Sequence, residues 1–241
     1  MIGEALSGGT GHDLSLTRKA FEHLRGLLIW AAKVVWGGRT FTSGLHGQRL
    51  PRRKEHTLRL SPDARSDLEW WGPGLVKFNG EARRLGALPP TLRLSADAMG
   101  KGGMGYFFDE GHYGGFRPGE LSEWEGYPTG VGQCDEEVAI MVWETFAIYV
   151  AIRCNPELVR DSLIAMWTDN PVTAKAVRDL RHKHPLVHGI VARIFWLATE
   201  LNFRFVRVEH IPGIQNGLSD ALSRGDRDRF AVLLAQWRGG G

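Results

Sequence analysis

The run Leu163-Ile164-Ala165-Met166-Trp167-Thr168, followed directly by Asp169, decides the fold class. An apolar run of this length with almost no polar break is typical of a strand buried on both faces of a sheet. Two helical stretches, residues 171–181 and 186–201, follow it, and residues 203–208 alternate again as a strand. This alternation of strands with helices predicts an α/β domain.

The segment before this run predicts further strands. Residues 91–97 alternate like a strand, residues 104–108 form a second strand after a glycine turn, and residues 113–116 form a third. A long glycine-containing loop then leads into a helix at 138–153, and a last helix begins at 217–222. We therefore expect strands that first pair as a hairpin and then alternate with helices.

The chain divides into four segments by composition. Residues 1–14 are rich in Gly, Ser and Thr and are expected to be disordered. Residues 15–88 form a small helical segment, and residues 81–90 are expected to be a linker. Residues 89–226 form the α/β domain, and residues 227–241 form a C-terminal helix and glycine tail.

Two helices are expected in the segment 15–88. The first begins at Ser15 or Thr17 and stops at Gly37-Gly38. The second opens with Ser61-Pro62-Asp63, where the serine is a cap and the proline fits the first helical position. We expect Gly72-Pro73-Gly74 to interrupt this second helix.

Composition excludes several classes of protein. The 241 residues are 43% hydrophobic and 24% charged, as in an ordinary globular chain. No run reaches the roughly 18 apolar residues of a membrane span, and the N-terminus lacks the features of a secretion signal. The two cysteines, Cys134 and Cys154, cannot form a disulfide framework or a four-ligand zinc site. We expect an intracellular protein that does not enter a membrane.

The formal net charge of +3 is mildly basic, and the cations are concentrated in residues 51–54 and 178–184. Such stretches permit nucleic-acid binding, but they are also typical of a solvated surface.

Four acids occupy positions that a folded sheet with its helices could bring together. Asp97 ends the first strand, Glu144 lies inside a helix among apolar residues, Asp169 ends the buried strand, and Asp220 opens the last helix. A buried carboxylate is costly unless it is paired or holds a metal. Carboxylate clusters suit a pair of Mg²⁺ or Mn²⁺ ions about 3.5–4 Å apart, which hydrolyse phosphate esters.

Each acid lies in a short motif. These motifs are Asp97-Ala98, Val142-Trp143-Glu144-Thr145-Phe146-Ala147, Trp167-Thr168-Asp169-Asn170, and His210-Ile211-Pro212-Gly213-Ile214-Gln215-Asn216-Gly217-Leu218-Ser219-Asp220-Ala221-Leu222-Ser223-Arg224. They resemble the ribonuclease H domain of retroelement reverse transcriptases, in a style closest to retrotransposons of the DIRS type. The segment 24–80 is similar to the thumb and connection segment that precedes this domain.

The resemblance implies a mixed five-stranded sheet flanked by helices and cleavage of the RNA strand of RNA–DNA hybrids. Asp97 and Asp169 would be the central ligands of two Mg²⁺ or Mn²⁺ ions, while Glu144 would hold one ion and place the attacking water. Asp220 would hold the other ion. The alternative helix acids Glu136 and Glu137 lie nearby, but Glu144 matches the family's helix, in which an alanine follows the glutamate by three.

Three further residues have expected roles near the site. His210 would assist product release or proton transfer, unless it is merely structural. Asn170 and Asn216 would orient ligands or backbone near the nucleic acid.

Cations near the acids would contact the substrate. Hybrids are recognised through their phosphates and 2′-hydroxyls, largely without regard to sequence. Arg178, Arg181 and Lys183 would contact phosphates if the helix after Asp169 faces the substrate, and residues 52–54 would extend that track.

The glycine-rich stretch at residues 100–105 matches a dinucleotide-binding pattern, but its context argues against that function. Residues 100–105 satisfy the G-x-G-x-x-G pattern of dinucleotide sites, which must open a helix. Here Tyr106-Phe107-Phe108 continues as a strand. The glycines are better explained by a hairpin that lets substrate backbone approach Asp97.

The leading hypothesis is a metal-dependent endonuclease of ribonuclease H type. No Tyr-x-Asp-Asp motif occurs, so we expect no polymerase activity from this chain alone; a reverse transcriptase palm would be a partner from the parent polyprotein. Two alternatives stay open: a catalytically silent module that binds or tethers hybrids, and another nuclease on the same fold, such as an integrase or resolvase.

Overall fold

The computed structural model describes residues 15–78 and 88–240. The chain forms two compact units, residues 1–83 and 84–241. The stretch 1–14, predicted to be disordered, and most of the predicted linker at 81–90 lie outside the described residues.

The N-terminal unit is mainly helical. Strand β1 (Ser15–Thr17) pairs antiparallel with β2 (Thr57–Arg59), and the hydroxyl of Thr17 caps the following helix by accepting a hydrogen bond from the Ala20 N–H. Large aromatic side chains, among them Trp70 and Trp71, fill the core of this unit. The helices are α2 (Arg18–Ala31), η1 (Thr40–Thr42), α3 (Ser43–Gly47) and α4 (Pro62–Phe78).

The predicted interruption at Gly72-Pro73-Gly74 is wrong, because α4 continues through it to Phe78. A proline inside a helix costs about 3 kcal/mol. Packing on both sides outweighs this cost: Trp70 and Phe78 are buried, and a Cβ at Gly74 would lie 2.8 Å from the Trp70 ring. The first helix is also shorter than predicted, since α2 ends at Ala31 and turns continue to Arg39.

The C-terminal unit is built on a mixed five-stranded sheet in the order β5-β4-β3-β6-β7. Strands β3, β6 and the edge strand β7 run parallel to one another. Strand β4 runs antiparallel to both of its neighbours, β3 and the edge strand β5. The strands are β3 (Leu92–Ala98), β4 (Met104–Phe108), β5 (Tyr113–Phe116), β6 (Leu163–Thr168) and β7 (Arg204–His210).

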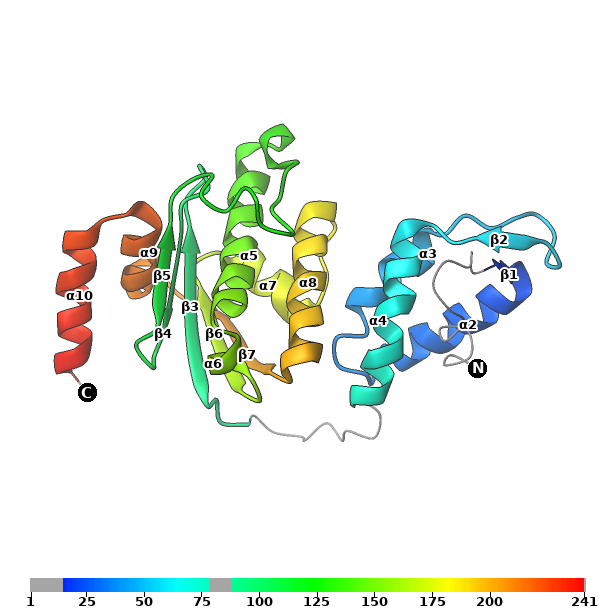
Figure 1. Ribbon diagram of the computed structural model, residues 1–241, viewed down its shortest axis with the longest axis horizontal. Coiled ribbons are helices and arrows are strands. Elements are labelled where there is room, and N and C mark those ends of the chain that lie inside the picture. Colours follow the sequence, from blue (N-terminus) through cyan, green and yellow to red (C-terminus); the bar gives the residue numbers. More distant parts are fainter. Residues whose placement is uncertain (1–14, 79–87, 241) are drawn as a thin grey trace. The chain divides into compact units, whose positions relative to one another are not determined.

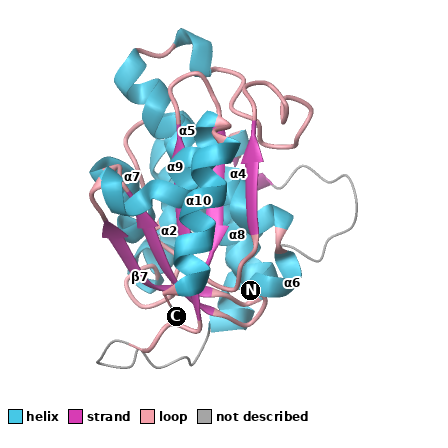
Figure 2. Cartoon of the chain, turned by 90° about the vertical axis from the view of Figure 1, so that its left-hand side faces the viewer, coloured by secondary structure: helices cyan, strands magenta, loops and turns pink. Residues whose placement is uncertain are grey.

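Helices cover both faces of this sheet. Helices α5 and α8 lie on one face, and α9 and α10 lie on the other (Figure 1). Figure 2 shows α10 in front of the sheet on this second face. The helices are η2 (Val131–Gln133), α5 (Glu136–Cys154), α6 (Pro156–Val159), α7 (Pro171–Asp179), α8 (Pro185–Leu201), η3 (Gly213–Asn216), α9 (Gly217–Arg224) and α10 (Arg227–Gly239).

The predicted fold class is therefore confirmed: the unit is a mixed α/β sheet flanked by helices, consistent with a ribonuclease H-like fold. None of the described helices combines the length and the apolar character that crossing a membrane requires.

Helix α5 brings one predicted acid into the core. Every residue from Met141 to Ile152 is buried, so the helix is enclosed on all sides. It packs against the sheet and against α8. Glu144 therefore lies where an apolar side chain would be expected, and only a specific local environment can accommodate its carboxyl group.

The glycine-rich hairpin between β3 and β4 serves the protein's own helix α9. A Cβ at Gly105 would lie 2.3 Å from the Ser219 carbonyl oxygen and 2.6 Å from the Ser223 nitrogen. The hairpin was predicted correctly, but in the structure the backbone that approaches its glycines belongs to α9.

Candidate functional site

Three of the four predicted acids meet at the carboxyl edge of the central strands. Asp97 lies near the end of β3, Asp169 directly follows β6, and Glu144 reaches them from α5. One carboxylate oxygen of each lies within 4.8 Å of the other two. The parallel pairing of β3 and β6 places the ends of these strands side by side, which explains how acids 72 residues apart in the sequence come together.

Asp97 is only 4% exposed, and its Oδ2 accepts a hydrogen bond from the Ser223 hydroxyl of α9. Burial raises the pKa of Asp97 to about 6, and the negative charges of Asp169 and Asp220 act in the same direction. The Ser223 hydrogen bond opposes this shift because it stabilises the ionised form.

Glu144 is 3% exposed and is held at both oxygens. Its Oε1 accepts from the Ala98 N–H at 3.1 Å, and its Oε2 accepts from the Thr168 hydroxyl at 3.2 Å. Burial raises the pKa of Glu144 well above its usual range, and the charges of Asp97 and Asp169 raise it further. The other acids considered, Glu136 and Glu137, are exposed in the first turn of α5 and lie outside the cluster.

Asp169 is partly exposed and forms the open side of the cluster. The chain returns close to it after β7, because a Cβ at Gly213 would lie 3.2 Å from its Oδ2. The next residue, Asn170, caps α7: its Oδ1 accepts from the N–H groups of Val172 and Thr173. Asn170 therefore orients the backbone at the start of α7.

Asp220 is not part of the three-acid cluster. Its Oδ1 binds Arg224 at 2.6 Å, and its Oδ2 forms an ion pair with Arg229 of α10. Burial favours a higher pKa for Asp220, but the hydrogen bonds and charges of the two arginines outweigh it and hold the pKa below its ordinary value. Its charge still acts on Asp97, so the carboxylate lies near the cluster while facing cations.

The remaining motif residues have distinct surroundings. Asn216 is buried and donates to the Ala96 carbonyl at 3.0 Å, so it positions the strand that carries Asp97. His210 is exposed at the end of β7, paired in register with Thr168. This register places its backbone one residue from Asp169, and the imidazole makes no hydrogen bond within the described residues.

The predicted phosphate contacts are exposed on and after α7. Arg178 reaches the Val208 carbonyl at 3.5 Å, and Arg181 and Lys183 lie on the surface. The helix begins directly after Asp169 and Asn170, whereas Arg178 lies in its last turn and Arg181 and Lys183 follow its end. Residues 52–54 are exposed in the N-terminal unit.

Three residues that the sequence analysis did not assign complete the site. Ser223 binds Asp97, Thr168 binds Glu144, and Arg229 pairs with Asp220. A signal existed for Ser223, because it follows Asp220 by three residues and thus lies on the same face of the helix. Thr168 had a weaker signal, as the last residue of the buried strand. Nothing local marks Arg229, which belongs to a separate helix.

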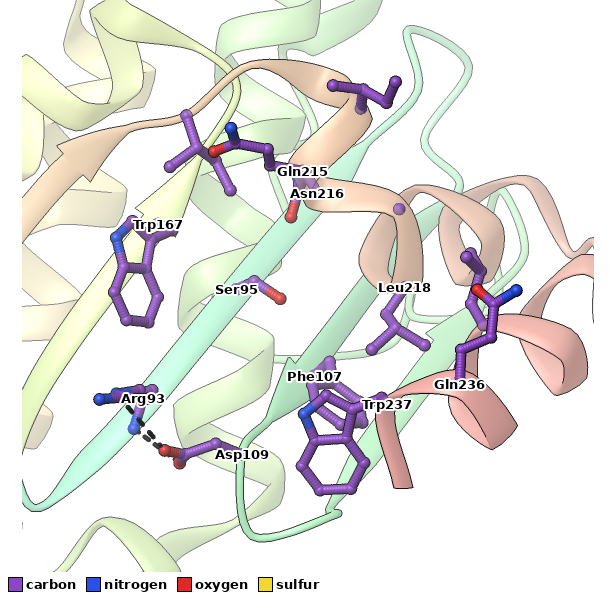
Figure 3. A pocket seen from close by; sticks show the side chains of 14 residues that line it. Arg93, Ser95, Phe107, Asp109, Trp167, Gln215, Asn216, Leu218, Gln236 and Trp237 are labelled. Atoms are coloured by element: carbon purple, nitrogen blue, oxygen red, sulfur yellow. Dashed lines mark hydrogen bonds and ion pairs between the residues drawn. The ribbon is translucent and has the colours of Figure 1, made fainter. Parts of the chain in front are cut away.

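A cavity of about 540 Å³ lies on the α9–α10 face of the sheet, and none of the four predicted acids lines it (Figure 3). Its floor is Ser95, whose register neighbours are Trp167 on β6 and Phe107 on β4. Two of its lining residues form hydrogen bonds with the segments around them: Ser95 with Ser219 at 2.7 Å, and Asn216 with the Ala96 carbonyl. The cavity is therefore separate from the acid cluster.

The donor set of the cluster fits a divalent cation. All three side chains offer oxygen, the ligand that Mg²⁺ and Mn²⁺ prefer. Within the part of the chain that the structure describes, none of the three forms an ion pair with a lysine or arginine. The carboxylates of the cluster repel one another, the charge of Arg224 offsets only part of this at Asp97, and a cation bound among them would relieve the repulsion.

Comparison with known proteins adds no relative: no protein-family model matches the sequence, and no curated protein matches it.

Proposed function

We propose that this chain is a divalent-metal-dependent endonuclease of ribonuclease H type, which hydrolyses the RNA strand of RNA–DNA hybrids. The observation that carries the proposal is the meeting of Asp97, Glu144 and Asp169 within 4.8 Å at the carboxyl edge of a mixed five-stranded sheet. The motif resemblance supplies the substrate class and a place in a retroelement reverse transcriptase, next to a thumb- and connection-like segment.

Asp97, Glu144 and Asp169 would hold Mg²⁺ or Mn²⁺, the ions that suit their oxygen donors. A pair of such ions lowers the pKa of an attacking water and stabilises the leaving oxygen in phosphodiester hydrolysis.

The chain's own residues prepare this chemistry by fixing the carboxylates. The Ala98 N–H and the Thr168 hydroxyl each donate a hydrogen bond to one oxygen of Glu144, and the Ser223 hydroxyl donates one to Asp97. Because all three are donors, they favour the ionised, cation-binding form of each acid against the effect of burial.

A second candidate function has one observation in its favour. Both oxygens of Asp220, the expected fourth ligand, are engaged by Arg224 and Arg229. A chain in which this acid stays engaged would bind hybrids without cutting them, as a tethering module.

The test is cleavage of a labelled RNA–DNA hybrid in Mg²⁺ or Mn²⁺. Asp97→Asn and Asp169→Asn should each lower the rate by about 10²-fold or more, since they remove charge from the centre of the cluster. Asp179→Asn is the matched control, because Asp179 is partly exposed and pairs with Lys175 outside the cluster. It should cleave at the wild-type rate.

Each alternative has its own result. Equal cleavage by wild type, Asp97→Asn and Asp169→Asn would reject the proposal. Salt-sensitive hybrid binding without any cleavage would identify the tethering module. Preferential cutting of DNA duplexes or junctions would indicate an integrase- or resolvase-like nuclease.

A further inference from the structure

A second hollow adjoins the acid cluster at the edge of the sheet. This β5–α9 groove has a volume of about 800 Å³ and lies between β5 with the turn that follows it and the junction of α9 with α10. Two of its lining residues connect it to the acids: Ser223 donates to Asp97, and Met99 follows Asp97 by two residues. One end of the groove is therefore lined by a residue that binds Asp97 of the candidate metal centre.

The groove is rich in cations. Arg117, Arg224 and Arg227 line it and are exposed. Arg224 binds Asp220, whereas neither Arg117 nor Arg227 has an ion-pair partner among the described residues. Two guanidinium groups are thus available for an anionic ligand, and arginine suits phosphate because of its planar set of donors.

The two acids that line the groove are already used within the protein. Glu120 Oε2 accepts from the Arg117 N–H at 2.8 Å. Asp226 Oδ1 accepts from the Arg229 N–H at 3.0 Å and so caps α10. These hydrogen bonds direct one oxygen of each carboxylate to the protein backbone. The two acids reduce the positive potential without pairing with either free guanidinium.

An exposed aromatic ring lies among the residues that line the groove with these cations. Tyr113 is 46% exposed and packs on Phe230 with ring centroids 4.6 Å apart. Strand β5 is an edge of the sheet, so this ring is not covered by another strand. An exposed ring next to a basic groove is typical of surfaces that bind single-stranded nucleic acid, because unpaired bases can stack on it.

We propose that the β5–α9 groove binds a single-stranded extension of the nucleic acid whose duplex part lies at the acid cluster. This inference rests on the proposed nuclease function and narrows the substrate to hybrids that carry a single-stranded end. A duplex stacks its bases internally and would leave Tyr113 unused, whereas an unpaired strand offers both phosphates and base faces.

The experiment compares a blunt RNA–DNA hybrid with four hybrids that each carry a single-stranded extension of about eight nucleotides at one end of one strand. Binding of the full chain is measured by fluorescence anisotropy at several salt concentrations, with EDTA in place of Mg²⁺ so that nothing is cut. At least one extension should strengthen binding about tenfold, because stacking of even one base has an effect of this order.

Variants of the groove should remove this advantage. Arg117→Gln and Arg227→Gln should each lower the salt slope of the extended hybrid by about 0.7, the value for one phosphate of a single strand. Tyr113→Ala should weaken the extended hybrid about tenfold and leave the blunt one unchanged. Arg160→Gln is the control, since Arg160 is exposed and pairs with Glu157 away from the groove.

Several results would overturn the inference. These are equal affinity for blunt and extended hybrids, groove variants that behave like Arg160→Gln, and groove variants that weaken both hybrids equally. Cleavage of the blunt hybrid in Mg²⁺ is measured in parallel. If cleavage fails while the extension still binds through Arg117 and Arg227, the nuclease function is rejected and the groove stands. If cleavage succeeds without any effect of the extension, only the groove is rejected.

Discussion

Arg229 of the last helix, α10, forms an ion pair with Asp220, which lies in the first turn of the preceding helix, α9. Arg224 binds the other oxygen of the same carboxylate. The positive φ of 68° at Gly225 turns the chain between the two helices and brings Arg229 back toward Asp220. The fourth predicted ligand is thus restrained by residues on both sides of that turn.

Releasing Asp220 should improve metal binding. Arg229→Gln removes one of the two cations, and a partly exposed pair of this kind contributes about 0.5–1 kcal/mol. The midpoint of a Mg²⁺ titration followed by thermal unfolding should therefore fall about two- to fivefold. Arg238→Gln, an exposed arginine near the end of the same helix, should leave the midpoint unchanged. A higher midpoint in Arg229→Gln would mean that the pair supports the site instead of restraining it.

The buried acids should make stability depend on pH when metal is absent. The pKa of Asp97 is raised to about 6 in the folded chain, so the native state binds more protons than the unfolded state above about pH 4. The stability that this proton contributes is complete below pH 4 and is lost as the pH rises through 6. The loss due to Asp97 is about 2–3 kcal/mol, and Glu144 adds to it in the same direction.

Urea unfolding in EDTA between about pH 4 and pH 7 measures this effect. Asp97→Asn should flatten the decline relative to wild type. A second carboxyl with a pKa raised by burial to about 6, Asp67, lies in the N-terminal unit and accepts from the Leu45 N–H. Asp67→Asn should flatten the decline independently, and an unchanged slope in both variants would contradict the proposed origin.

Magnesium should reverse the pH dependence. A bound cation requires ionised carboxylates, so protons compete with it at the cluster. Addition of Mg²⁺ should raise the melting temperature clearly near pH 7.5 and little near pH 5, because Asp97 is largely protonated at the lower pH. Glu136→Gln, an exposed acid of the same helix as Glu144, is the control and should show the wild-type gain. An equal gain at both pH values would place the metal elsewhere.

Some parts of this molecule were predictable from local sequence because local physics determines them. The run 163–168 forms β6 since an apolar segment of that length can only be buried, and Glu144 stood out because its helical neighbours are apolar on every side. Burial of both faces leaves a strong pattern, and an acid within it is conspicuous.

Other parts depend on contacts between distant segments, which a single sequence does not record. The continuation of α4 through Pro73 depends on the packing of Trp70 and Phe78. The pairing of Asp220 with Arg229 depends on the angle between two helices. The sequence shows that acids and arginines both occur in the last two helices, but only the packing of these helices determines which acid pairs with which arginine.

Gly105 should be essential for the fold of the site. An added Cβ would meet backbone atoms of α9, at 2.3 Å from the Ser219 oxygen, and backbone cannot move aside as a flexible side chain can. Gly105→Ala should destabilise the C-terminal unit by about 2–3 kcal/mol, in the range of overpacked cores. Gly132→Ala is the matched control, because nothing lies within 4 Å of its Cβ position. Equal urea midpoints for the two variants would contradict the close approach of α9.

Ser223 should act on the reaction through Asp97. Its hydroxyl donates to Asp97 Oδ2 and favours the ionised carboxylate, so its removal should raise the pKa of Asp97 further. A hydrogen bond to a charged group contributes about 1.5 kcal/mol, which corresponds to a pKa change of about one unit. In Ser223→Ala the acid limb of the pH–rate profile for hybrid cleavage, and the pH midpoint of Mg²⁺ binding, should both move up by about one unit.

Ser223→Thr retains the hydroxyl group and should restore both midpoints, whereas a purely structural role would lower the rate at every pH without moving either midpoint. The metal-binding midpoint also tests the contact when no hybrid is cut, since it requires only the cluster itself. If Ser223→Ala shifts the metal-binding midpoint but the rate profile stays in place, Asp97 binds the ion without controlling the rate. If neither midpoint moves, the Ser223–Asp97 hydrogen bond does not tune the candidate metal centre.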